Sequence, residues 1–148
     1  MPRPRPPTAA PASPDDVETQ FYEALQRADI DSLMAVWSDD DDIVCVHPGG
    51  PRVIGPAAVR ASFESMFGNG SIDAHPEQVR RLQGPACAVH SVLEHVRVAT
   101  GQGARSAWVI ATNVYVQTAR GWRLAAHHAS PGSEREVQEM LEAGSTIH

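Results

Sequence analysis

The side chains of this sequence best suited to chemistry are histidines, and the first of them is His47. It follows a short apolar run and stands directly before Pro48, at the expected end of a strand. Because side chains alternate along a strand, His47 shares a face with Ile43 and Cys45. An imidazole there can act as a general base near neutral pH, since its ordinary pKa lies near that value. The alternative interpretation is a half-exposed histidine beside a Pro-Gly turn.

A second group of candidates lies mainly in two later strand-like stretches. Asn113 alternates with apolar residues and with Tyr115, so a ligand carbonyl or a neighbouring side chain must satisfy its amide. His127 and His128 are adjacent in the last expected strand, so they point to opposite faces and only one can face a pocket. Trp37 follows an expected short helix, where core packing and ligand contact are both open interpretations.

Metal, cofactor and covalent chemistry find little support in the sequence. His47 and His128 lack the third protein ligand of a catalytic zinc site. The acidic run 39–42 lacks the glycine and the distal glutamate of a calcium loop, and we interpret it as a solvated turn. There is no serine nucleophile elbow, phosphate loop or dinucleotide fingerprint. We therefore expect no metal and no cofactor.

Three helices are expected to position these side chains. Ser13 and Pro14 provide a capping hydroxyl and a proline at the first helical position, and two acids follow in the first turn. Apolar residues at three- and four-residue spacing then continue through Phe21. Asp29 can cap a short second helix, and Gly55-Pro56 opens a third.

After about residue 70 the hydrophobic period changes to two. Strands are expected near 72–82, 86–99, 106–117 and 122–130, separated by glycine-containing turns. Helices followed by meandering strands predict an α+β fold, a cone-shaped roll in which a strongly curved antiparallel sheet wraps around about three N-terminal helices. A ligand pocket would form at its wide end. The residues expected in the core are Phe21, Leu25, Val59, Phe63, Val92, Val114 and Leu124.

The domain limits follow from composition. Residues 1–13 are rich in proline and alanine and are expected to be a disordered tail. Residues 14–131 are expected to form the pocket domain, and residues 132–148 a C-terminal tail in which 134–143 has a weak helical pattern.

Four stretches of the sequence resemble the nuclear-transport-factor-2-like superfamily. They are ALQRADIDSLMAVWSDD, VHPGG, GPAAVRASFESMF and GWRLAAHHASP. The likeness runs from about residue 15 to 131 and is greatest to the SnoaL-like and ketosteroid-isomerase-like members. It implies a pocket inside the cone, roofed by Phe21 and Trp37, with His128 rather than His127 pointing inward.

The resemblance also bears on activity. Ketosteroid isomerase uses a carboxylate base, a tyrosine donor and a protonated aspartic acid. At the matching positions this chain has His47 for the base and Asn113 for the aspartic acid. Phe21 takes the tyrosine position, with Tyr22 one residue, about 100°, further round the helix. These changes argue against steroid isomerisation by that mechanism.

Composition excludes several classes of partner. The chain has 148 residues and a formal net charge of −6, and the expected fold contains no cluster of lysine and arginine. Nucleic acid and anionic membranes are therefore unfavourable partners. Cys45 and Cys87 lack metal spacing; a secreted chain of this size could pair them, but we interpret them as buried thiols of a cytoplasmic protein. No apolar run of about 18 residues occurs, so no transmembrane helix is expected.

Three functions remain open from the sequence. The first is an enzyme for proton transfer or hydration of a small apolar carbonyl compound. The second is a pocket protein without chemistry, and the third is an association domain. The first assigns a tentative catalytic role to His47. The ligand would be contacted by Phe21, Trp37, Asn113, Tyr115 and His128. A homodimer is also expected, because Trp108, Ile110 and Val114 give the outer sheet face an apolar surface.

Overall fold

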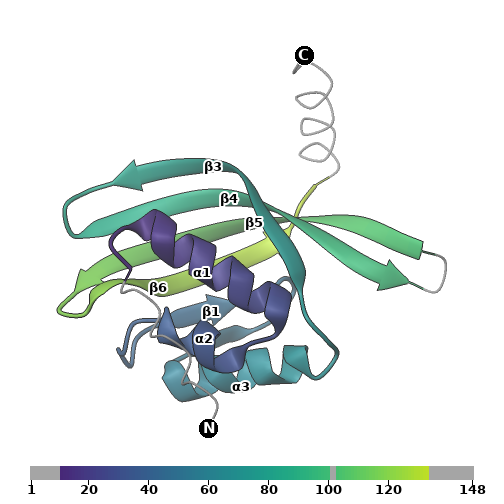
Figure 1. Cartoon of the computed structure of the whole chain (residues 1–148), viewed down its shortest axis with the longest axis horizontal. Helices are drawn as coiled ribbons and strands as arrows, with labels where there is room; N and C mark the ends of the chain where they lie inside the picture. The colour runs from purple at the N-terminus through teal and green to yellow at the C-terminus, as the bar shows by residue number, and fades with distance from the viewer. Residues whose placement is uncertain (1–10, 101–102, 134–148) are drawn as a thin grey trace, which may run out of the picture.

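The computed structural model describes residues 11–100 and 103–133, and it has the expected α+β architecture. Three helices and two short strands precede four long strands (Figure 1). The elements are α1 (Pro14–Arg27), α2 (Ile30–Ala35), β1 (Val44–Val46), β2 (Arg52–Ile54), α3 (Pro56–Phe67), β3 (Asp73–Gln83), β4 (Cys87–Thr100), β5 (Gly103–Thr118) and β6 (Gly121–Pro131).

The helix boundaries follow from local capping chemistry. The Ser13 hydroxyl accepts a hydrogen bond from the Asp16 backbone N–H at 3.1 Å, and Pro14 occupies the first turn of α1. Asp29 caps α2 in the same way, accepting from the Ser32 N–H. Gly55 precedes α3 with a φ of 90°, a conformation that favours glycine. The predicted starts of all three helices are confirmed.

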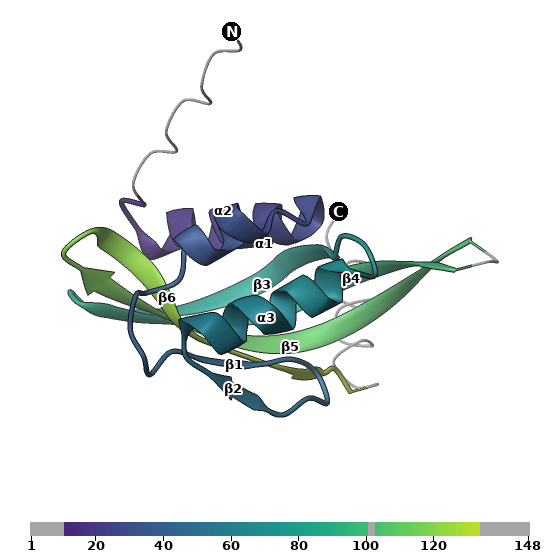
Figure 2. The ribbon, with the colours of Figure 1, turned by 90° about the horizontal axis from the view of Figure 1, so that it is seen from below.

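The sheet has six strands in the order β2-β1-β6-β5-β4-β3. All neighbouring pairs are antiparallel except β1 and β6, which run parallel. Helix α1 lies across β3, β5 and β6, and α3 packs against α2 and β2 (Figures 1 and 2). The paired ends of β4 and β5 project beyond the helices (Figure 1). The inward side chains of β4, β5 and β6 therefore meet α1.

A β-bulge in β6 changes which side chains point inward. Val114 pairs with Ala126, but the next residue of β5 pairs with Leu124, so Ala125 has no partner. An extra residue in one strand reverses the alternation beyond it. Leu124 is buried before the bulge, and His127 is buried after it, while His128 is exposed. The prediction that His128 faces inward is wrong for this reason.

Most of the expected core residues are buried, at 4% exposure or less: Phe21, Leu25, Val59, Phe63, Val92 and Leu124. Val114 instead lies half-buried on the opposite face of β5 from Asn113. Cys45 is a buried free thiol, but Cys87 is exposed, contrary to expectation.

The limits of the domain differ slightly from those expected. Pro11 is buried, and its carbonyl accepts a hydrogen bond from the Trp122 N–H at 3.4 Å. The folded region therefore begins before residue 14. The helical pattern over 134–143 lies outside the described residues, as do residues 1–10. No helix in the described ranges is long and apolar enough to cross a membrane.

Candidate functional site

Four buried polar side chains form a continuous hydrogen-bonded chain between α1 and the sheet. Asn113 Nδ2 donates to the Tyr22 hydroxyl at 3.2 Å, and the Tyr22 O–H donates to Glu94 Oε2 at 2.7 Å. At the other end, His127 Nδ1 lies 2.5 Å from Asn113 Oδ1. We call Tyr22, Glu94, Asn113 and His127 the acid–base cluster.

The direction of these bonds fixes the state of His127. A carbonyl oxygen can only accept, so the Asn113 contact places the proton of a neutral imidazole on Nδ1. The Nε2 atom of His127 is then an acceptor. It lies 3.9 Å from Glu94 Oε2, which is also an acceptor when ionised. Two acceptors therefore face each other when Glu94 is ionised, and a proton on Glu94 removes their repulsion.

Burial shifts both ionisable ends of the cluster toward the neutral form. The pKa of Glu94 is raised from 4.5 to about 7, chiefly by burial, with the Tyr22 hydrogen bond lowering it and the charge of Glu18 raising it. The pKa of His127 is lowered to about 3, by burial first and then by repulsion from His47 and His128. Near neutral pH the cluster holds a neutral imidazole beside a carboxyl group that can gain or lose a proton.

His47 lies at the edge of this region. Its Nε2 is 3.0 Å from the Ser62 hydroxyl, which itself donates to the Val59 carbonyl. The hydroxyl therefore accepts from His47 Nε2, and Nδ1 of the neutral ring is left as an acceptor. The His47 ring meets Phe63 edge-on at 4.8 Å, and burial lowers the pKa of His47.

A second buried polar group, the Glu18 cluster, lies further toward the start of α1. Glu18 Oε2 is 2.6 Å from His90 Nδ1 and accepts from the Tyr115 hydroxyl at 2.9 Å. His90 Nε2 has no hydrogen-bond partner among the described residues and is 4.0 Å from Asp15 Oδ1. Asp15, Glu18 and His90 are close enough to be considered for a metal. Asp15 Oδ1 already accepts from Arg81, however, and Glu18 Oε2 accepts from both His90 Nδ1 and Tyr115, so donors already satisfy the two carboxylate oxygens of this group.

The predicted site residues are only partly brought together. Phe21 covers His127, with ring centroids 5.1 Å apart, and lies 6.4 Å from Trp37. Asn113 is buried on the inward face of β5, as its alternation predicts, and belongs to the acid–base cluster, whereas Tyr115 belongs to the Glu18 cluster. His128 is exposed and faces away. Whether these residues bind a ligand stays a prediction.

Several members of the two clusters were missed from the sequence. Tyr22 places a buried hydroxyl from α1 in the acid–base cluster, whereas the resemblance put Phe21 at the matching position; both side chains are buried. Glu94 and His90 alternate with Val92 on the inward face of β4. Ionisable side chains on an otherwise apolar strand face were the signal that could have identified them.

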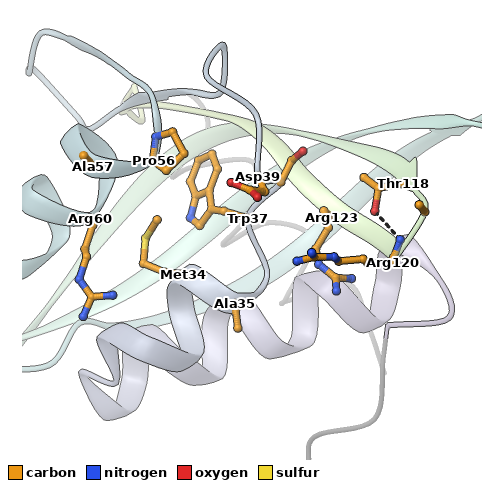
Figure 3. A pocket seen from close by; sticks show the side chains of 12 residues that line it. Met34, Ala35, Trp37, Asp39, Pro56, Ala57, Arg60, Thr118, Arg120 and Arg123 are labelled. Atoms are coloured by element: carbon orange, nitrogen blue, oxygen red, sulfur yellow. Dashed lines mark hydrogen bonds between the residues drawn. The ribbon is translucent and has the colours of Figure 1, made fainter.

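A separate groove of about 890 Å³ lies beyond Trp37, at the β5–β6 turn (Figure 3). It is not the expected pocket of the cone interior, because its walls come from α2, the start of α3 and that turn. The lining residues are Met34, Ala35, Trp37, Ser38, Asp39, Pro56, Ala57, Arg60, Thr118, Ala119, Arg120 and Arg123.

Comparison with known proteins identifies the family. Residues 15–134 match the SnoaL-like domain. The chain belongs to the SnoaL-like family. Its NTF2-like cone fold is shared with solved structures, and no curated protein matches the sequence.

Two structures resemble this SnoaL-like chain in sequence as well as fold. One is a candidate calcium/calmodulin-dependent protein kinase type II association domain from Thiobacillus denitrificans, 35% identical, covering 82% of this chain and 97% of that chain, with a TM-score of 0.75. The other is a candidate dehydratase of the NTF2-like family from Streptomyces avermitilis, 28% identical, covering 79% and 92%, with a TM-score of 0.71. An NTF2-like protein from Pseudomonas putida, 20% identical over 84% and 87% with a TM-score of 0.70, shows the fold alone.

Proposed function

We propose that this SnoaL-like protein catalyses proton transfer on a small, largely apolar carbonyl compound. The observation that carries the proposal is the buried carboxyl of Glu94, whose pKa is about 7 and whose neighbour His127 is a neutral acceptor. A carboxylate with this pKa is a stronger base than an exposed one and still exists ionised near neutral pH. Similarity to a candidate dehydratase is consistent with such chemistry.

The proposed reaction assigns a role to three members of the cluster, Glu94, Tyr22 and His127. The Glu94 carboxylate removes a proton from the carbon next to the carbonyl and becomes a carboxylic acid, leaving an enolate. Its new O–H can close the 3.9 Å gap to His127 Nε2. The Tyr22 hydroxyl, no longer held by a carboxylate, can donate to the enolate oxygen. Return of the proton from Glu94 to carbon completes the transfer.

Glu94 replaces His47 as the proposed base. His47 is half-buried and donates through Nε2 to Ser62. Electrostatic repulsion from His47 also lowers the pKa of His127, so His47 borders the cluster. We assign it a ligand-lining role. Phe21 supplies an apolar contact above His127.

The test is exchange of carbonyl-adjacent hydrogens with solvent deuterium. Cyclohexanone and 2-indanone are incubated with the protein in D₂O, and the loss of proton signal is followed by NMR. Exchange should rise with pH through about 7 as Glu94 ionises. Glu94→Gln should lower it at least about 100-fold, whereas Glu23→Gln, which changes an exposed acid on α1, should not. No exchange above the buffer rate for either ketone, or equal rates in both variants, would contradict the proposal.

A second candidate function is association through the sheet. The outer face of β4 and β5 carries Trp108, which stacks on His95 with ring centroids 4.4 Å apart, and the half-buried residues Ile110 and Val114. A relative 35% identical is a candidate association domain. We propose a homodimer through this face. Light scattering should give twice the chain mass, and Trp108→Glu should give the monomer mass; a monomer at all concentrations would refute the dimer.

A further inference from the structure

The groove beyond Trp37 has the chemistry of a binding site that is separate from the acid–base cluster. Trp37 forms the boundary between them, because it lines the groove and also packs against Phe21 and Phe63, at centroid distances of 6.4 and 6.5 Å. Phe21 in turn covers His127. A molecule in the groove would therefore lie on the opposite side of an aromatic layer from Glu94.

One wall of the groove is apolar. Met34, Trp37, Pro56 and Ala57 line it, and Figure 3 shows the indole of Trp37 between Met34 and Pro56. Trp37 is 4% exposed, and its Nε1 has no hydrogen-bond partner among the described residues. A buried N–H normally finds a partner. The wall thus offers an apolar surface, and the indole of Trp37 carries a buried N–H without a partner among the described residues.

The other end of the groove is positively charged. Arg120 from the β5–β6 turn and Arg123 from the start of β6 line it, and neither forms an ion pair with any residue in 11–100 or 103–133. The turn is ordered, since the Thr118 hydroxyl donates to the Gly121 carbonyl at 2.8 Å and accepts from the Arg120 N–H at 3.1 Å. The guanidinium groups therefore extend from a fixed backbone (Figure 3).

Further features bear on the sign and size of the ligand's charge. Helix α3 begins at the groove with Pro56, has no side-chain cap and has no acid in its first turn, so its dipole also favours an anion. Arg60 is used by Asp31 and Glu64, at 2.8 and 2.9 Å. Arg123 Nη1 donates to the Trp122 carbonyl at 2.8 Å, which leaves its other N–H groups for a ligand. The carboxylate of Asp39 also lines the groove, which disfavours a polyanion.

We propose that this groove binds a small organic monoanion with an apolar body. Its carboxylate would pair with Arg120 and Arg123, and its apolar body would lie against Met34, Trp37 and Pro56. Arginine suits this role because its fork of donors matches the geometry of a carboxylate.

The experiment compares a charged ligand with its neutral counterpart by calorimetry. The probes are 2-naphthoate and 2-naphthalenemethanol, titrated into the full chain at low ionic strength. The anion should bind at least about tenfold more tightly than the alcohol. Arg120→Gln and Arg123→Gln should each raise its Kd roughly tenfold. Arg105→Gln, at an exposed arginine of β5 outside the groove, should leave the Kd unchanged within about twofold.

Each other outcome would overturn the proposal. These outcomes are no binding of 2-naphthoate, equal binding of the alcohol, wild-type affinity in both groove variants, or an equal loss in Arg105→Gln. Far-ultraviolet dichroism checks that each variant is folded, and Arg120→Glu provides a second variant in which the loss should be larger. Deuterium exchange of ketones should be unchanged in Arg120→Gln, so failure of this proposal is distinguishable from failure of the proposed reaction.

Discussion

The two buried polar clusters are built from the same kinds of residue but differ in how their carboxylates are satisfied. In the Glu18 cluster, one carboxylate oxygen receives two donors, from His90 Nδ1 and from the Tyr115 hydroxyl. In the acid–base cluster, Glu94 receives one donor, from Tyr22, and its other neighbour His127 presents an acceptor. A carboxylate with sufficient donors is a structural element, whereas one that faces an acceptor is ready to take up a proton.

The first prediction concerns the largest expected effect, the pH dependence of stability contributed by Glu94. Its folded-state pKa of about 7 lies above its ordinary 4.5, so its favourable contribution is fully present below pH 4.5 and is lost as the pH rises through 7. The loss is about 3 kcal/mol. Glu94→Gln resembles the protonated acid. The variant should therefore match wild type near pH 4 and be about 3 kcal/mol more stable at pH 8.

Urea unfolding at several pH values measures this difference directly. His127 contributes with the opposite sign, because its lowered pKa makes its contribution present above pH 6.5 and lost as the pH falls toward 3. That contribution is common to wild type and Glu94→Gln, so it largely cancels in the comparison. If the difference in free energy of unfolding between wild type and Glu94→Gln does not change between pH 4 and 8, the pKa of Glu94 is not raised by folding.

The second prediction makes the matching substitution, Glu18→Gln, in the Glu18 cluster. At pH 8, Glu18→Gln should lower the free energy of unfolding by about 2 kcal/mol. The neutral amide oxygen is a weaker acceptor for His90 and Tyr115, and its NH₂ group brings donors that the cluster does not need. The same unfolding assay applies. If Glu18→Gln and Glu94→Gln shift stability in the same direction at pH 8, the distinction between the two clusters fails.

The parts of the fold set by local chemistry were predictable from the sequence. Ser13 and Asp29 cap helices through bonds to backbone groups three residues away, and Gly55 adopts its positive φ beside a proline. The long strands follow from alternation. The short strands β1 and β2 are different: each has three residues, and β1 is ordered by parallel pairing with β6, some 80 residues later in the chain. Of these two short strands, only β1 (Val44–Val46) lies within a run that the sequence predicted as a strand.

The site was less predictable because it depends on contacts between distant segments. Tyr22 and Glu94 are 72 residues apart, and neither has an unusual local sequence. Asn113 was placed correctly because β5 alternates without interruption up to it. The last strand was assigned the wrong parity because the bulge at Ala125 depends on pairing with β5, and no glycine or proline marks that position.

The last and smallest prediction tests the bulge through the two adjacent histidines. His128 is exposed, so His128→Ala should change the free energy of unfolding by no more than about 0.5 kcal/mol. It should also leave ketone exchange unchanged. His127→Ala should cost about 2 kcal/mol or more, because it leaves Asn113 Oδ1 without its donor in a buried site. It should also slow exchange, since the acid form of Glu94 loses its acceptor. Equal effects of the two substitutions in both assays would mean that β6 keeps regular alternation and that His127 has no special place beside Glu94.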